Sequence, residues 1–100
     1  MQREPVAIRL LEGQSTTETR VRVAIYAPIR FEGTEEFRCN YSITGSQVDV
    51  QRFAAGLDSA QALQLALVGV GANLDRYETK HGDKLMWAGS DHGFPRNTGS

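Results

Sequence analysis

The fold of this chain is decided by residues 56–67, which read GLDSAQALQLAL. Asp58 can cap a helix, because its carboxylate accepts hydrogen bonds from the free amides of the first turn. Gln61 lies three residues later, where its side chain can reach back to the Asp58 amide as in a capping box. Leu57 and Ala62 occupy the two positions of a hydrophobic staple, although alanine makes a weak one. This stretch therefore predicts that a long helix begins directly after Asp58.

The predicted helix spans residues 59–77. Its apolar residues recur at spacings of four, three and four, which places them on one continuous stripe: Leu63, Leu67, Val70 and Leu74. Gly69 and Gly71 lie inside the helix, where each costs about 1 kcal/mol relative to alanine. We interpret them as small residues that let the helix lie close to a sheet, the alternative being a kink or an early stop. Gly82 is a natural C-cap.

The chain before the helix reads as strands. Apolar and polar residues alternate with period two over residues 6–11, 19–27 and 37–44, and less regularly over residues 47–53. A last short strand is expected over residues 84–88. Short turns between successive strands favour antiparallel hairpins or a meander. The predicted fold class is α+β in the order β-β-β-β-α-β, an antiparallel sheet of four to five strands with one long helix on one face.

Length and composition indicate one domain over residues 1–100, with residues 91–100 as a candidate flexible tail. The net charge of −1 argues against general electrostatic binding to nucleic acid or to anionic lipid. The longest mostly apolar stretch, residues 60–74, is too short and too polar to span a bilayer. The single cysteine can form no internal disulfide, and the first residues lack a signal-peptide pattern. We therefore expect a cytoplasmic protein.

One candidate site is the sheet face that points away from the helix. If Val21, Val23 and Ile25 face the helix, the alternating residues face outward. The predicted partner-binding face consists of Arg9, Arg20, Arg22, Tyr26 and Arg38. Such a face could bind an acidic protein partner or a nucleic-acid backbone. Aromatic stacking platforms are scarce, which makes nucleic acid the less favoured partner. The alternative is a solvated polar face whose arginines pair with Glu12, Glu18 and Glu32.

A second candidate site lies near the C-terminus. The residues that would line a small-ligand pocket there are Trp87, Asp91, His92 and Arg96. An arginine fork and a proton-carrying histidine would suit an anionic or carboxylate ligand. The alternative is that Phe94 and Pro95 tuck back onto the core while the polar residues face water. Residues 90–92 form no catalytic triad, because adjacent residues of an extended chain point to opposite sides.

Other catalytic chemistry finds little support in the chain. His81, Asp83, Asp91 and His92 are residue types that bind metals, but their spacing matches no known metal motif. We therefore expect no metal and no cofactor. Cys39 alternates with apolar residues of the third strand, which indicates a buried inert thiol more than a nucleophile. We predict no catalytic residue, and no phosphate-binding glycine loop or nucleophile elbow is found.

Several patterns together resemble a family of small bacterial proteins of unknown function over residues 6–96. They are FxCxYxIxG at residues 37–45, GLDSxQALxLAL at 56–67, WxG at 87–89 and GFP at 93–95. Similar DxxQAL helices occur in small proteins that are encoded beside bacterial toxins as immunity proteins. The resemblance implies a bacterial cytoplasmic protein and no assigned activity.

Three functional hypotheses follow, and no motif identifies an activity, a ligand or a partner. The leading one is a non-enzymatic domain that binds another protein, as an accessory or immunity-like protein. The alternative is a small-ligand-binding protein or minor enzyme that uses the C-terminal segment. The third is a homodimer formed through the open edges of a small sheet.

Overall fold

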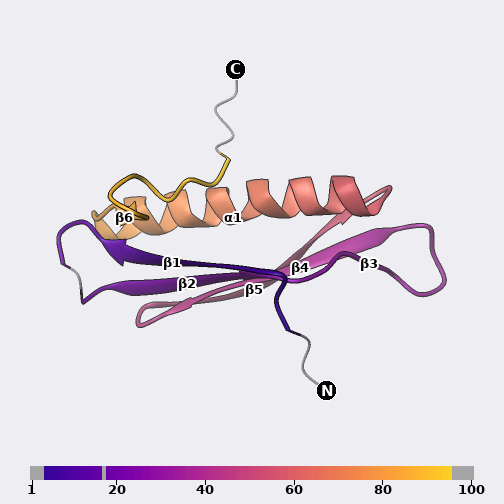
Figure 1. Cartoon of the computed structure of the whole chain (residues 1–100), viewed down its shortest axis with the longest axis horizontal. Helices are drawn as coiled ribbons and strands as arrows, with labels where there is room; N and C mark the ends of the chain where they lie inside the picture. The colour runs from indigo at the N-terminus through magenta and orange to yellow at the C-terminus, as the bar shows by residue number, and fades with distance from the viewer. Residues whose placement is uncertain (1–3, 17, 96–100) are drawn as a thin grey trace.

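The computed structural model describes residues 4–16 and 18–95. In this part of the chain one helix covers one face of an antiparallel sheet (Figure 1), which confirms the α+β class. The elements are β1 (Ala7–Gly13), β2 (Arg20–Ile25), β3 (Ile29–Arg30), β4 (Phe37–Gly45), β5 (Val48–Gly56), α1 (Ser59–His81) and β6 (Leu85–Met86). The four long strands and the helix are the predicted ones. β3 was not predicted, because two residues are too few to show an alternation.

The sheet is built around β4. β5 pairs with one edge of β4 over nine residues, while β2 and β3 share the other edge. β1 pairs with β2, and β6 pairs with the last two residues of β1. Every pairing is antiparallel, so the long strands form the expected meander. β5 therefore forms one edge of the described sheet, and β1 with the short β6 forms the other.

The helix begins as predicted and ends later than predicted. The Asp58 carboxylate accepts a hydrogen bond of 2.7 Å from the Gln61 amide. The Gln61 side chain, however, accepts from the amide of Leu57 at 2.6 Å, one residue before the position that a capping box predicts. Leu57 is 84% exposed, so its side chain forms no buried staple. The helix continues to His81, where Gly82 adopts a left-handed conformation (φ 64°) and caps it.

Both helix glycines lie at close contacts, which confirms the small-residue interpretation for an uninterrupted helix. A Cβ atom on Gly69 would lie 2.7 Å from the Tyr41 hydroxyl oxygen in β4. A Cβ atom on Gly71 would collide with the backbone carbonyl of Pro95. Gly69 therefore lets α1 approach the sheet, whereas Gly71 makes room for the C-terminal segment.

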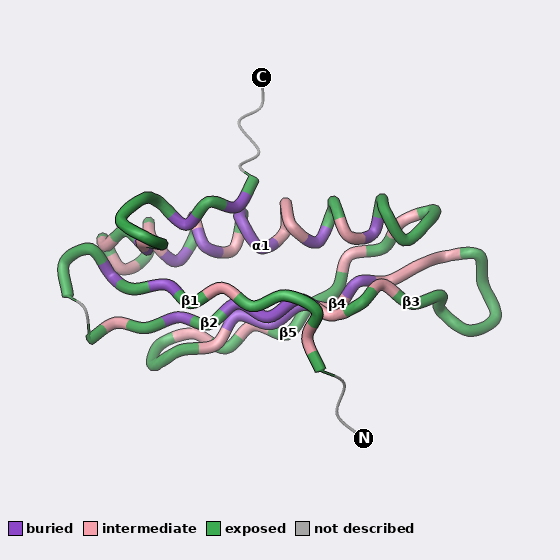
Figure 2. The backbone as a smooth tube through the Cα atoms, in the orientation of Figure 1, coloured by how far each residue is buried: buried purple, intermediate pink, exposed green. Residues whose placement is uncertain are grey.

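The core lies between α1 and the sheet face toward it, as the buried segments in Figure 2 show. Its fully or nearly fully buried members include Leu11, Val21, Val23, Cys39, Ile43, Val70, Leu74 and Leu85. Burial raises the pKa of the Cys39 thiol, which donates a hydrogen bond of 3.3 Å to the Tyr26 carbonyl. This confirms the prediction of a buried thiol, since a thiol with a raised pKa is a poor nucleophile.

The orientation of β1 corrects one prediction. Arg9 lies opposite Val23, and opposite residues of an antiparallel pair share a face. Val23 is fully buried beneath α1, so Arg9 points to the helix side and the prediction that it belongs to the outward face is wrong. Leu11 is buried on this side, while Ile8 and Leu10 are exposed on the other. The alternation of β1 was ambiguous because both sets contain apolar residues.

Candidate functional site

We define the outer face as the side of the sheet that points away from α1. The strand register assigns residues to it row by row. Leu10, Arg22, Thr44 and Asp49 form one row across the four long strands. Ile8, Ala24, Ser42 and Gln51 form the next row, followed by Tyr26, Asn40 and Phe53. Four of the five residues predicted for partner binding therefore share the outer face: Arg20, Arg22, Tyr26 and Arg38.

The outer face is more apolar than predicted. Large exposed apolar side chains gather on it or at its rim: Val6, Ile8, Leu10, Ile29, Phe31 and Phe53, with exposed fractions of 43–67%. Sequence reasoning missed this surface because Ile8 and Leu10 looked like core residues of a half-buried strand. Apolar side chains that cluster on one side of a soluble domain are typical of interaction surfaces.

The arginines of the outer face differ in how they are held. The Arg38 guanidinium lies 3.6 Å from the ring centre of Phe31 and 4.4 Å from that of Phe53, and it pairs with Glu36. Arg20 lies 3.7 Å from the Glu12 carboxylate, an exposed pair that contributes little to stability. Arg22 is exposed and has no ion pair within residues 4–16 and 18–95. It is therefore the cation on this face that is available to a ligand.

A shallow depression of about 910 Å³ lies at the β6 end of this surface. Its outer-face lining consists of Leu10, Glu12, Arg20, Arg22, Thr44 and Met86. The turn of Ala88 and Gly89 closes one side of it. The depression thus combines apolar side chains with two guanidinium groups and with the carboxylates of Glu12 and Glu18. Because Arg22 has no ion pair in the described chain, the depression can accept a small apolar side chain that carries a carboxylate nearby.

The C-terminal candidate residues lie elsewhere. The backbone of Trp87 exchanges hydrogen bonds of 2.8 and 2.9 Å with that of Ser90. The chain then runs back along α1 (Figure 1). The Arg9 guanidinium lies 3.7 Å from the centre of the Trp87 ring and donates to the His92 carbonyl at 3.0 Å. Arg9 therefore holds this segment against the inner side of the sheet.

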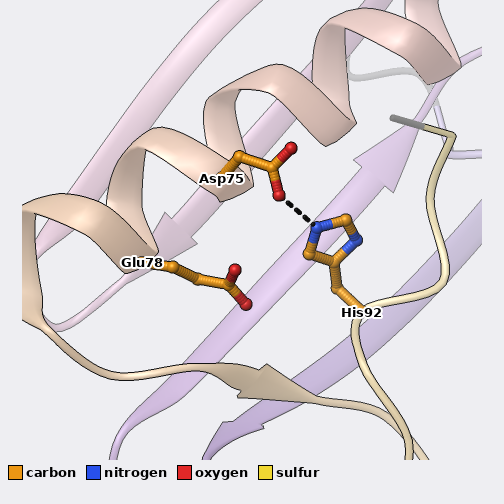
Figure 3. A group of neighbouring side chains, drawn as sticks. All are labelled: Asp75, Glu78 and His92. Carbon is orange, nitrogen blue, oxygen red and sulfur yellow. Dashed lines mark hydrogen bonds and ion pairs between the residues drawn. The ribbon is translucent and has the colours of Figure 1, made fainter. Parts of the chain in front are cut away.

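His92 is fully buried, and Figure 3 shows one of its ring nitrogens in contact with the Asp75 carboxylate. Its Nδ1 lies 3.1 Å from the backbone nitrogen of Phe94, and its Nε2 lies 2.9 Å from Oδ1 of Asp75. A backbone amide can only donate, so Nδ1 is unprotonated and Nε2 carries the proton. His92 is therefore neutral and donates to the Asp75 carboxylate. The contact is a hydrogen bond between neutral imidazole and carboxylate.

Asp75, Glu78 and His92 could together be taken for a metal site, because one ligand atom from each lies within 4.8 Å of the others. The hydrogen bonds argue against that use. A metal ion on Nε2 would move the proton to Nδ1, where it would face the amide of Phe94, another donor. Glu78 also accepts from the Leu85 amide at 2.8 Å. We conclude that this cluster fastens the C-terminal segment to α1.

The structure brings only some of the C-terminal candidates together. His92 points to α1, Trp87 lies beside Arg9, and Asp91 is exposed and accepts from the Gly93 amide at 3.0 Å. Phe94 is buried in the core, as the alternative interpretation predicted, but His92 is also buried and does not face water as that interpretation expected. Arg96 lies outside the described residues. The use of these residues for ligand binding stays a prediction. The partner of His92, Asp75, was missed, although its spacing of three from Glu78 put both on one helix face.

Fold and site define a small α+β domain with a core on one face of its sheet and a partly apolar outer face. The chain belongs to the family described as "Domain of unknown function (DUF6968)", whose model matches residues 7–96. This agrees with the predicted membership of an uncharacterised family. No curated protein and no solved structure matches the chain. Within the described residues, no helix has both the length and the apolar character to cross a membrane.

Proposed function

We propose that this domain is a non-enzymatic accessory protein that binds another protein through the outer face. The observation that carries the proposal is the set of exposed apolar side chains on that face, of which Leu10 and Ile8 lie nearest to Arg22, a cation that lacks an ion pair in the described chain. Interfaces of this kind bury apolar groups at their centre and use arginine for directed polar contacts. The matching partner has an apolar surface bordered by carboxylates.

The depression beside Arg22 supports a defined mode of contact. Leu10 and Met86 supply apolar walls, and Arg22 can receive a carboxylate from the same partner. Arg20 has a distant and exposed partner in Glu12, so it can turn to a second carboxylate at little cost. These features favour an acidic protein over a nucleic acid, which would need several unpaired cations and stacking platforms.

The proposal includes a bacterial cytoplasmic setting. A free cysteine that is fully buried suits a reducing compartment. The sequence resembles a family of small bacterial proteins, and its DxxQAL helix resembles helices of small immunity proteins that are encoded beside bacterial toxins. An immunity-like protein acts by binding and covering its partner, which requires a surface and no catalytic group.

The proposal is tested by comparing which proteins variants capture from a native bacterial extract. Leu10→Glu and Arg22→Glu place a carboxylate in the proposed interface, and Leu65→Glu makes the same kind of change at an exposed leucine of α1. We expect a specific partner whose capture falls about tenfold with the first two variants and is unchanged with the third. Capture that does not depend on Leu10 and Arg22 would contradict the proposal.

A further inference from the structure

β5 leaves one backbone edge open. Its nine residues pair with β4 on one side, and no backbone hydrogen bond from the described residues reaches its other side. The strand, VDVQRFAAG, contains neither proline nor lysine, the residues that commonly protect a sheet edge. The open part of the opposite edge is shorter, because β6 covers Glu12 and Gly13 of β1 and leaves only residues 7–11 open. An open edge of the length of β5 can pair with an added strand.

Two arginines line the α1 side of this edge. Arg52 lies opposite Tyr41 in the register of β4 and β5. Asn73 of α1 donates to the Tyr41 hydroxyl at 3.3 Å, and Arg76 donates to the Asn73 side chain at 3.2 Å. Arg52 and Arg76 therefore approach the same phenol, one from the sheet and one from the helix. Burial raises the pKa of Tyr41, and the two nearby positive charges oppose that rise.

Neither arginine has a carboxylate partner within residues 4–16 and 18–95. Their charges are thus uncompensated in the described chain, at the seam between α1 and β5. The other side of the edge differs in character. Phe53 lies on the outer face, is 49% exposed, and has Arg38 packed on its ring. The edge therefore presents cations toward α1 and an aromatic ring toward the outer face.

We propose that β5 accepts an extended segment of the partner protein as an additional strand. Side chains of a strand alternate between the two faces. The segment would place carboxylates toward Arg52 and Arg76 and apolar side chains toward Phe53. Backbone hydrogen bonds supply affinity in this mode, and the alternating side chains supply specificity. This inference rests on the proposed function, because the same partner would bind the outer face and add this segment to β5.

A second copy of this chain fits the edge less well. Antiparallel pairing of β5 with its own copy offers Val48, Val50, Arg52 and Ala54 on the α1 side, with no carboxylate among them. Its acidic residue, Asp49, lies on the outer face. Self-pairing would therefore offer the Arg52 of each copy no carboxylate on its own side of the sheet. Charge complementarity favours a different protein with an acidic alternating segment.

The test uses a synthetic peptide that alternates glutamate and valine around a central phenylalanine. One control peptide has lysine in place of every glutamate. A second control peptide has the residues of the test peptide in an order without alternation. Amide NMR spectra of the labelled protein should show shifts and slowed hydrogen exchange centred on β5 with the alternating peptide. Arg52→Gln with Arg76→Gln should weaken binding about tenfold, while Arg30→Gln, at an exposed arginine of β3, leaves it unchanged. Equal affinity for all three peptides, or shifts elsewhere, would overturn the inference.

The same variants in the extract experiment separate the two proposals. If the inference is right, the double variant Arg52→Gln with Arg76→Gln no longer captures the partner. The separate variant Leu10→Glu is expected to show the same loss. If Leu10→Glu loses the partner and the double variant keeps it, the edge inference fails while the proposed function stands. Thermal unfolding confirms that each variant is folded, so a loss of binding is not a loss of structure.

Discussion

His92 shows how one side chain can position a whole segment. Both of its ring nitrogens are occupied, one by the amide of Phe94 and one by the Asp75 carboxylate. Its carbonyl also accepts from Arg9, so helix, sheet and C-terminal segment meet at this residue. A buried polar side chain with all its partners contributes stability, and its removal leaves those partners unsatisfied.

His92→Ala is therefore expected to lower the free energy of unfolding by about 2–4 kcal/mol, from the cavity and from the lost hydrogen bonds. Urea unfolding measures the change, and Trp87 fluorescence reports the release of the segment. Thr79→Ala, at an exposed position of α1, is the control and should change stability by less than about 0.5 kcal/mol. A similar small effect for both variants would contradict the role of His92.

Ala88 is strained at the tip of its turn. Its φ is 51° and that of Gly89 is 79°, the combination of a type I′ turn, in which asparagine followed by glycine is preferred. Ala88→Asn should stabilise the protein by about 0.5–1 kcal/mol, because asparagine tolerates the left-handed conformation better. Thermal unfolding checks this. Ala72→Asn, at an exposed position of α1, should instead destabilise the protein. A stability change of the same sign at both sites would refute the explanation.

At the scale of elements, α1 is shaped by what packs on both of its sides. The sheet contacts it at Gly69 through Tyr41, and the C-terminal segment contacts it at Gly71 through Pro95. Glycine normally weakens a helix. Here the two glycines are explained by the space they leave, because any side chain would push a neighbouring element away.

Gly71→Ala should consequently destabilise the protein by about 1–3 kcal/mol, although the same change at a free helix position stabilises by about 1 kcal/mol. The new methyl group meets a backbone carbonyl, which can move only if the C-terminal segment moves. Urea unfolding gives the free energy, and NMR shifts should concentrate at Phe94 and Pro95. Ala72→Gly calibrates helix propensity alone. An increase in the free energy of unfolding for Gly71→Ala would contradict a close contact between Gly71 and the Pro95 carbonyl.

At the scale of the whole molecule, the two faces of the sheet differ in burial. One face is covered by α1, and the core between them holds Cys39, Tyr41 and Tyr77. The outer face has no covering element in the described chain. Burial raises the pKa of all three groups above the ordinary values of 9.0 for the thiol and 10.0 for the phenols. The core therefore resists ionisation at alkaline pH.

This predicts a loss of stability in alkali. The unfolded chain releases these protons near pH 9.0 and 10.0, whereas the folded chain keeps them to higher pH. The folded state then binds more protons, so the free energy of unfolding falls as pH rises above about 9. Urea midpoints between about pH 7 and pH 10.5 measure the decline. Cys39→Ala and Tyr77→Phe should make it shallower; an unchanged slope would contradict the assignment.

The sequence by itself determined the helix start at Asp58, the cap at Gly82, the four long strands and the α+β class. These features depend on capping, turns and alternation among residues close in the chain, so they can be read locally. The sequence also placed Arg20, Arg22, Tyr26 and Arg38 on one face of the sheet, because β2 and β4 have a clear alternation.

Only the tertiary structure decided which side of β1 faces the helix. Both sets of alternating residues in β1 are apolar enough to be buried, and pairing with β2 selected Leu11 over Ile8 and Leu10. Long-range packing likewise joined His92 to Asp75 and set Arg52 beside the seam that holds Arg76. These pairs come from elements far apart in the chain, and their meeting depends on packing that no local pattern encodes.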